Sequence, residues 1–389
     1  MRTAIYAKIT TIKFVYHTLS SQMHQKLNDT MASNCDFDSS LFAKYYLKEE
    51  DVPELDLKYS VTSGGILHQL QAMFSEKSKL LTRSFVDVSS DLADESTRFR
   101  VMQWNILAQG LSFGKDNFIR CPRDALDWKF RRLRLLEEIL RVRPDILCLQ
   151  EVDHFGFLLP IMKKLGYNGS FFPKPDSPCL FTACSNGPDG CAMFYRTSKF
   201  SCLEKESIVL MRDSNKALTN QVSIIYKFAL KDDSRLEVAV ATTHLKAKNG
   251  WEQLRMEQGA YLVNYLHEKF CNTPLIICGD FNAEYSEPVY QVFAESPLSL
   301  GSAYKLLNKG LNCEPPYSTW KIRGGFNGSE TDVCHTIDYI WYTKNRLKVR
   351  ALLNFPTEED IGPDRLPSYQ YPSDHFSLAS DFMFTLDDD

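Results

Sequence analysis

Five short polar motifs stand directly after apolar stretches, and together they carry the residue types of a phosphate-cleaving centre. They are Asn105, Gln150-Glu151, His244, Asp280-Phe281-Asn282 and Asp374-His375, with His335 and Asp338 between the last two. Each is weak alone, because an Asp-x-Asn sequence is more often a turn and a lone histidine is usually structural. Five motifs in one region favour a shared catalytic site over unrelated caps and turns.

These residue types suit the hydrolysis of a phosphate ester with the help of magnesium. Mg²⁺ prefers oxygen ligands and commonly takes one or two carboxylates, with water and substrate phosphate in the other positions. Glu151 is the natural direct ligand, and Asn105 offers an uncharged oxygen beside it. A zinc hydrolase is disfavoured because no His-x-x-x-His pair and no cysteine pair supplies the usual zinc ligands.

The remaining motif residues fit supporting roles in the same reaction. The imidazoles of His244 and His375 can donate hydrogen bonds to phosphoryl oxygens as negative charge builds on them. Asp338 can orient His375, as carboxylates do in other catalytic pairs. Asp280 can accept a proton from the attacking water, and Asn282 can hold that water or the phosphate.

Alternating apolar segments predict the elements that position these residues. Strands are predicted at Phe99–Trp104, Asp145–Leu149, Leu236–Thr243, Pro274–Cys278, Ile337–Thr343 and Phe376–Phe384. Amphipathic patterns predict helices at Leu126–Arg141 and Gly250–Phe270. Strands interleaved with helices indicate a layered α/β domain, and such folds place their sites just beyond strand ends.

The first 97 residues lack this pattern. We predict a largely flexible tail with one short helix near Ile66–Phe74, where apolar residues recur at helical spacing, and a catalytic domain over residues 98–389. Residues 1–28 contain no acidic residue but several cations, as mitochondrial presequences do. A leader without a targeting role, with translation starting at Met23 or Met31, is the alternative. The expected location is therefore mitochondrial, cytoplasmic or both.

Bulk composition limits the partners of the chain. The 389 residues carry a net charge of −4, which argues against tight, non-specific binding of nucleic acid. The 11 cysteines form no C-x-x-C pair, as expected for free thiols in a reducing compartment. No run of 18 apolar residues is present, so we predict no membrane span. We expect a monomer.

Taken in order, the motifs resemble those of the endonuclease/exonuclease/phosphatase superfamily. The matching segments are Met102–Ala108, Cys148–Asp153, Thr243–Lys246, Cys278–Ala283, Thr336–Ile340 and Tyr371–His375. The resemblance covers roughly residues 98–385. It implies an α/β fold of four layers, in which two sheets form a sandwich with helices on the outside, and it implies magnesium at Glu151.

Further segments resemble one subgroup of that superfamily, which is related to the poly(A) deadenylases. They are Trp104–Gln109, Gly114–Phe118, Phe171–Pro175, Asn186–Ala192, Pro315–Arg323 and Ile361–Pro363. This resemblance implies an Mg²⁺-dependent phosphatase that removes the 2′-phosphate of NADP(H) to give NAD(H). Shortening of poly(A) from its 3′ end, with contact to RNA, is the alternative. A scaffold with an inactive site is disfavoured because no disabling substitution is present.

Four cations are candidates for binding the phosphates of such a substrate: Lys174, Lys246, Lys248 and Arg323. Without the resemblance, we would interpret them as solvated surface charges. Position 248 departs from the subgroup, which has arginine there, and lysine keeps the charge but loses the bidentate fork. The segment Gly324–Thr331 is longer than usual and is expected to alter the rim of the pocket.

Overall fold

The computed structural model describes residues 52–53, 55–57, 62–74, 78–89, 95–114, 117–308, 311–325 and 328–385. The described residues all belong to one compact unit, Glu49–Asp389. The predicted targeting segment at residues 1–28 lies outside the described residues.

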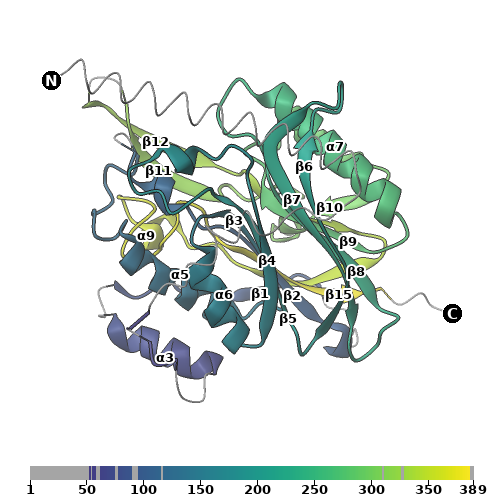
Figure 1. Ribbon diagram of the computed structural model, residues 1–389, viewed down its shortest axis with the longest axis horizontal. Helices are drawn as coiled ribbons and strands as arrows, with labels where there is room; N and C mark the ends of the chain where they lie inside the picture. Colours follow the sequence, from purple (N-terminus) through teal and green to yellow (C-terminus); the bar gives the residue numbers. More distant parts are fainter. Residues whose placement is uncertain are drawn as a thin grey trace. The chain divides into compact units, whose positions relative to one another are not determined.

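Two mixed β-sheets form the centre of the fold (Figure 1). The seven-stranded sheet contains, in spatial order, β1 (Phe85–Asp87), β14 (Leu347–Leu353), β15 (Leu378–Phe384), β2 (Phe99–Asn105), β3 (Ile146–Val152), β5 (Gly190–Arg196) and β4 (Tyr167–Pro173). The six-stranded sheet contains β10 (Leu300–Ser302), β13 (Asp338–Thr343), β9 (Leu275–Asp280), β8 (Glu237–His244), β7 (Leu218–Leu230) and β6 (Phe200–Met211). A separate hairpin pairs β11 (Thr319–Gly324) with β12 (Glu330–His335).

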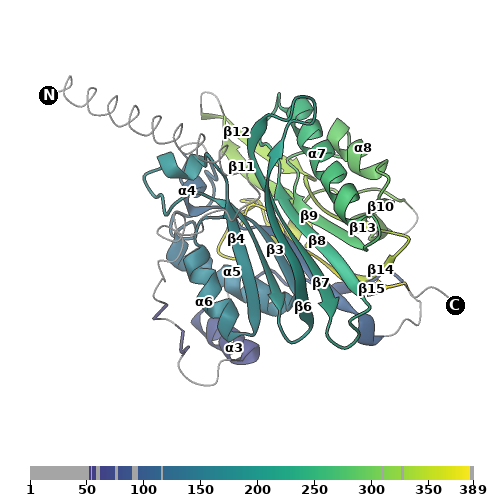
Figure 2. The same ribbon diagram turned by 45° about the vertical axis from the view of Figure 1, so that its right-hand side comes forward.

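The two sheets pack face to face, and helices cover their outer faces (Figure 2). Apolar side chains from both sheets form the inner core, among them Val101 of β2 and Ile276 of β9. The helices are α3 (Ser63–Met73), α4 (Gln109–Ser112), α5 (Trp128–Val142), α6 (Phe155–Lys164), α7 (Glu252–Phe270), α8 (Pro288–Ala294) and α9 (Glu358–Ile361). The predicted four-layer α/β sandwich is therefore confirmed.

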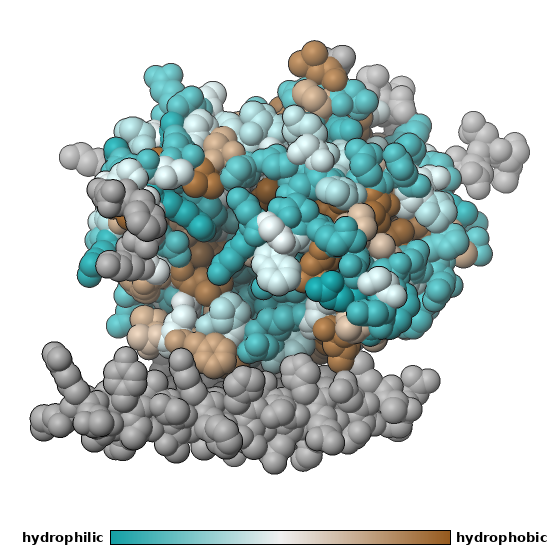
Figure 3. Space-filling view, turned by 90° about the horizontal axis from the view of Figure 1, so that it is seen from above, coloured by the Kyte–Doolittle hydropathy of each residue, from teal (hydrophilic) through white to brown (hydrophobic). Residues whose placement is uncertain are grey.

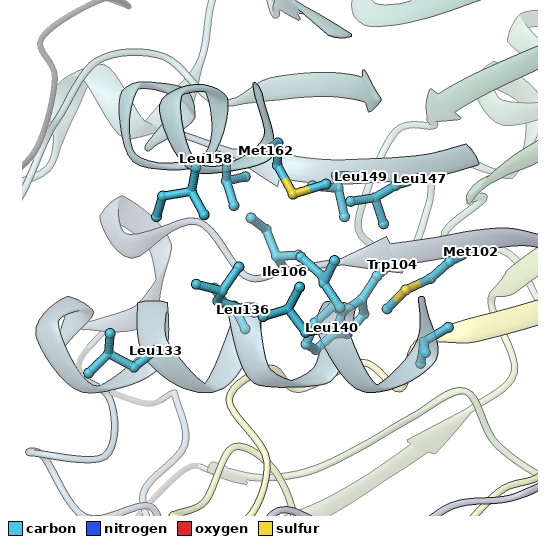
Figure 4. Close-up of a cluster of buried hydrophobic side chains, with 14 of the residues drawn as sticks. Met102, Trp104, Ile106, Leu133, Leu136, Leu140, Leu147, Leu149, Leu158 and Met162 are labelled. Carbon is cyan, nitrogen blue, oxygen red and sulfur yellow. The ribbon is translucent and has the colours of Figure 1, made fainter. Parts of the chain in front are cut away.

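Helix α5 shows how the sequence forms the outer layers. Asp127 caps its first turn by accepting a hydrogen bond from the Lys129 amide, and Arg143 ends it in the left-handed region. Leu136 and Leu140 lie in one buried apolar cluster with Met102 and Trp104 of β2 (Figure 4). Because β2 lies between this helix layer and the second sheet, it is apolar on both faces.

Parallel pairing brings the motif residues to the same end of the sandwich, where these strands finish. Strand β2 runs parallel to β3, with Asn105 opposite Gln150, and β8 runs parallel to β9, with His244 opposite Asp280. Antiparallel β13 places Asp338 opposite Asp280. Gly279 permits the close approach of β8, since a Cβ atom there would lie 2.4 Å from the Thr243 oxygen.

The described residues between 52 and 97 differ from the prediction of a tail. The expected short helix is present as α3, where Ile66 and Leu70 are buried against the core that α5 and α6 share. Strand β1 adds to the edge of the seven-stranded sheet by pairing with β14. Burial of these apolar groups from water holds the segment on the domain, so the folded unit begins before residue 98.

The surface and the cysteines agree with the composition. Hydrophilic residues cover most of the face that Figure 3 shows, with smaller hydrophobic areas between them. Among the described residues, no helix is long and apolar enough to cross a membrane. Every cysteine of the described residues is a free thiol.

Candidate active site

The structure brings seven predicted residues together at the C-terminal ends of β2, β3, β8 and β9. We call them the catalytic centre: Asn105, Glu151, His244, Asp280, Asn282, Asp338 and His375. All except Glu151 and Asn282 are buried, and these two are half-buried. His335 is not among them, because it is exposed on β12, where its Nδ1 lies 2.7 Å from Glu284.

Asp280 occupies the middle of the catalytic centre. Its Oδ2 accepts a hydrogen bond from Asn105 Nδ2 at 2.9 Å, and its Oδ1 accepts one from the Asn282 amide at 2.9 Å. Burial raises the pKa of Asp280 to about 7, the charge of Asp338 adds to this, and His375 opposes it. A carboxyl with a pKa near neutrality suits proton transfer to and from water.

Glu151 enters the site from a strained backbone. Its φ is 54°, a left-handed conformation that glutamate rarely adopts. The carboxylate accepts hydrogen bonds from Asn105 Nδ2 and the Ala108 amide, both at 3.1 Å. Burial raises the pKa of Glu151, and the positive charge of Lys174 opposes this shift.

Asn105 differs from its predicted role. Its Oδ1 accepts a hydrogen bond from the Leu107 amide at 3.0 Å, which fixes the orientation of the side-chain amide. The nitrogen therefore faces Glu151 and Asp280, and the oxygen points away from them. Asn105 acts as a donor that holds two carboxylates side by side.

His375 and Asp338 form the predicted oriented pair. His375 Nδ1 lies 2.8 Å from Asp338 Oδ2, which also accepts a hydrogen bond from Ser318 at 2.7 Å. Burial alone would lower the pKa of His375, but Asp338, Asp374 and Asp280 together raise it to about 9. The imidazole is therefore a cation near neutral pH, with Nε2 directed toward Asp280 at 3.8 Å.

The pKa of His244 is shifted in the opposite direction from the pKa of His375. Burial lowers its pKa well below the ordinary value, and the charges of Lys174 and His375 add to this. Asn282 Nδ2 lies 2.9 Å from His244 Nε2 and also donates to the Leu245 carbonyl at 3.1 Å. Two imidazoles in one site thus carry different charges, a neutral His244 and a protonated His375.

The donor set fits a divalent cation. Glu151, His244 and Asp280 each offer a ligand atom, and these atoms lie within 4.8 Å of one another. Asp280, Asp338 and His375 form a second group of the same kind, but protonated His375 disfavours it. Carboxylates and imidazole are among the ligand types that divalent cations bind in proteins.

Two buried arginines, which the sequence did not single out, hold the loops beside the site. Arg131 of α5 donates to the Ile106 carbonyl at 2.9 Å and the Leu107 carbonyl at 2.6 Å. Arg255 of α7 donates to the carbonyls of Lys246 at 3.0 Å and Lys248 at 2.8 Å. Each arginine fixes the loop that follows one catalytic strand.

The four predicted phosphate-binding cations fall into two kinds. Lys174 is buried, and its Nζ lies 2.6 Å from Asp189, so it is not a free cation at the surface. Lys246 is half-buried, whereas Lys248 and Arg323 are exposed. Burial lowers the pKa of Lys246, and the charges of Lys248 and Lys174 lower it further.

Lys321 is a further cation that the sequence did not reveal. It is buried on β11 and forms an ion pair with Asp374. Burial alone would raise the pKa of Asp374, but Lys321 and His375 lower it to about 2. The pair connects the hairpin to the catalytic centre, and only its long-range contact, not its local sequence, identifies it.

Similarity to known proteins in sequence and structure identifies the family of this chain. The model of the Endonuclease/Exonuclease/phosphatase family matches residues 102–375. Human nocturnin is 49% identical over 327 residues, covering 83% of this chain and 74% of that protein. The structure of the human nocturnin catalytic domain with bound sulfate anion matches with a TM-score of 0.65 at 44% identity, covering 78% of this chain and 97% of that one.

A more distant relative is named as a nuclease. The CCR4-Not complex 3′-5′-exoribonuclease subunit Ccr4 of Debaryomyces hansenii is 28% identical over 335 residues, covering 75% of this chain and 40% of that protein. Enzymes of this family are hydrolases that generally depend on a divalent metal, in agreement with the donor set above. The chain belongs to the endonuclease/exonuclease/phosphatase family and is a homologue of the nocturnins.

Proposed function

We propose that this protein is a magnesium-dependent phosphatase that removes the 2′-phosphate of NADP(H) to give NAD(H). The observation that carries the proposal is the cationic rim, which we define as Lys246, Lys248 and Arg323, beside the catalytic centre. The charges of Lys248 and Lys174 both act on Lys246, and the charge of Arg323 acts on Asp374, next to His375. Positive charge is therefore present near the catalytic centre at both Lys246 and Arg323.

The charge of the substrate explains why such a rim favours a terminal phosphate. A phosphate monoester carries close to two negative charges near neutral pH, because its second pKa is roughly 6. An internal RNA phosphodiester carries one. Several cations beside a buried catalytic centre discriminate between these charges more strongly than they would in bulk water. A dinucleotide also presents a pyrophosphate, which one part of the rim can bind while the 2′-phosphate occupies the centre.

Each residue of the catalytic centre has its own role in the proposed reaction. Glu151 would hold the magnesium ion, with His244 and Asp280 beside it, and the ion would supply positive charge to the phosphoryl oxygens. Asp280 accepts the proton of the attacking water, for which its pKa of about 7 is suitable. His375 donates a hydrogen bond from Nε2 to a phosphoryl oxygen as negative charge develops.

The second candidate is shortening of poly(A) from its 3′ end. The similarity to Ccr4 favours it, although the chain spans less than half the length of that protein. The same centre can cleave a phosphodiester, so the two candidates differ in what the rim binds. The net charge of −4 argues against tight binding of a long RNA, whose affinity depends on neutralising many phosphates.

Turnover of both substrates by one purified batch tests the proposal. We expect phosphate release from NADPH that requires Mg²⁺ and stops with a chelator, and much slower shortening of a labelled oligoadenylate. Arg323→Ala should reduce the NADPH activity strongly. Arg235→Ala is a matched control, because Arg235 is exposed in a turn and pairs with Asp233 of the same turn. Rapid oligoadenylate shortening without NADPH turnover would replace the proposal by the deadenylase alternative.

A further inference from the structure

A hollow of about 450 Å³ lies at the ends of central strands of the seven-stranded sheet, at the end opposite the catalytic centre. Arg100 near the start of β2 and Asp145 just before β3 line it, whereas Asn105 and Glu151 lie near the far ends of the same strands. Five or six residues of extended strand separate the two places by roughly 17–20 Å. The hollow is therefore distinct from the active site.

The hollow concentrates positive charge in an acidic chain. Five of its seven lining residues are cations, and the other two are Asp145 and Asp381, an excess of three positive charges. The whole chain has a net charge of −4. The cations are Arg98, Arg100, Arg143, Arg196 and Lys199, which come from separate parts of the chain and converge on one space.

The two carboxylates orient the cations. Asp381 is buried and accepts hydrogen bonds from Arg100 Nε at 2.6 Å and Arg98 Nε at 3.1 Å. Asp145 accepts hydrogen bonds from Arg196 Nε and Lys199 Nζ, both at 3.1 Å. Because each carboxylate is shared by two cations, it restrains their side chains without cancelling their charge, and less side-chain entropy is lost when an anion binds.

Arg143 is the least restrained of these cations. It stands at the C-terminal end of α5 in the left-handed region, and its side chain is exposed. Among the described residues it makes no side-chain hydrogen bond or ion pair. The other four cations are half-buried and fixed by Asp145 and Asp381, so Arg143 is positioned to close over a bound anion.

We propose that this hollow binds the polyphosphate group of a small ligand that carries three or more negative charges. A volume of 450 Å³ lies in the range of small-molecule sites. No aromatic ring lines the hollow among the described residues, so the recognised group is the phosphate chain rather than a base. The cations surround one space instead of following a track, which favours a compact anion over a nucleic-acid strand. Inorganic tripolyphosphate and a nucleoside triphosphate share this group.

Calorimetry with the full chain in a chelating buffer tests the proposal. We expect sodium tripolyphosphate to bind at least about tenfold more tightly than orthophosphate. Arg143→Asn and Lys199→Gln should each weaken it about fivefold or more, as loss of one charge-assisted contact does. Asparagine tolerates the left-handed backbone at position 143. Lys199→Gln leaves Asp145 paired with Arg196. Arg235→Gln, in a surface turn, is the matched control and should change nothing.

A second titration, with ATP, distinguishes a nucleotide ligand from an inorganic polyphosphate. If ATP binds as tightly as tripolyphosphate and both pocket variants weaken it equally, the site takes nucleotides through their phosphates. If only tripolyphosphate binds, the site is specific for the inorganic chain. NADPH turnover by both variants should stay within about twofold of wild type, since neither residue belongs to the catalytic centre or its rim.

Three outcomes would overturn the proposal. They are the absence of tripolyphosphate binding, equal weakening by Arg235→Gln, and binding that Arg323→Ala abolishes while both pocket variants retain it. The last outcome would assign the anion to the active site. Hydrogen exchange on the wild-type chain provides a measurement that needs no variant. Tripolyphosphate should protect residues 143–145 and 196–199, and unchanged exchange in both segments would contradict the proposal.

Discussion

The catalytic centre and the cationic rim differ in how firmly the fold holds their side chains. In the centre, Asn105 joins Glu151 to Asp280 and Ser318 holds the Asp338 carboxylate, all through hydrogen bonds of 3.1 Å or less. In the rim, Lys248 and Arg323 are exposed. A preorganised centre can supply chemistry that many phosphate esters share, so the selectivity that we propose would depend on the surface charges of the rim.

The largest effect is expected from removing the charge of Glu151. Glu151→Gln keeps the size of the side chain but loses the carboxylate that would hold the metal. We expect no measurable phosphate release from NADPH, and calorimetry should show weaker binding of Mg²⁺. Full turnover by this variant would mean that the centre does not depend on Glu151 and would remove the basis of the assignment.

The next largest effect concerns the proton acceptor. Asp280→Ala should lower kcat at least ~10²-fold, at the low end for loss of acid–base catalysis, while thermal melting shows an intact fold. Asp233→Ala, in a surface turn, is a suitable control and should retain full activity. An Asp280→Ala enzyme within tenfold of wild type would show that another group takes the proton.

The pH profile distinguishes the two ionisations inside the centre. Asp280 must be ionised to accept a proton, so the rate should rise through its pKa of about 7. His375 must be protonated to donate, so the rate should fall above its pKa of about 9. A bell-shaped profile of kcat/KM between these values is expected.

Removing the charge of Asp338 should shift this profile. The Asp338 carboxylate raises the pKa of both Asp280 and His375, so Asp338→Asn should move both limbs to lower pH. Glu284→Gln removes the carboxylate of the exposed His335 pair and is a matched control that should leave the profile unchanged. An alkaline limb that stays in place in Asp338→Asn would exclude His375 as its source.

The smallest effect is expected in the rim. Lys248→Arg should lower KM for NADPH about twofold to fivefold with unchanged kcat, because a planar fork binds phosphate better than a point charge. Lys216→Arg is the matched control, since both lysines are exposed and both have positive φ, 81° at Lys248 and 54° at Lys216. An unchanged or higher KM would indicate that Lys248 does not face the substrate.

The sequence predicts the centre better than its surroundings, for a physical reason. An apolar strand followed by a polar residue is a local pattern, so Asn105, His244 and Asp280 could be recognised one strand at a time. The functional groups then meet because β8 and β9 run parallel, as β2 and β3 do. The same local patterns predicted α5 and α7 to within a few residues of their ends.

The sequence does not reveal contacts between residues that lie far apart in the chain. Arg131 and Arg255 look like surface charges of amphipathic helices, yet both are buried and hold loops beside the site. Lys174 is neutralised in part by Asp189 through the folding of the segment between β4 and β5. Strand β1 has three residues, which is too short for an alternating pattern, so its place in the sheet depends on pairing with β14.

The products formed from NADP test the central claim most directly. Phosphorus NMR during turnover resolves the 2′-phosphate, the pyrophosphate and inorganic phosphate in one sample. We predict that the 2′-phosphate signal is replaced by inorganic phosphate while the pyrophosphate signals persist, and that the same batch shortens oligoadenylate far more slowly. Loss of the pyrophosphate signals, or unchanged NADP beside rapidly shortened oligoadenylate, would contradict the account.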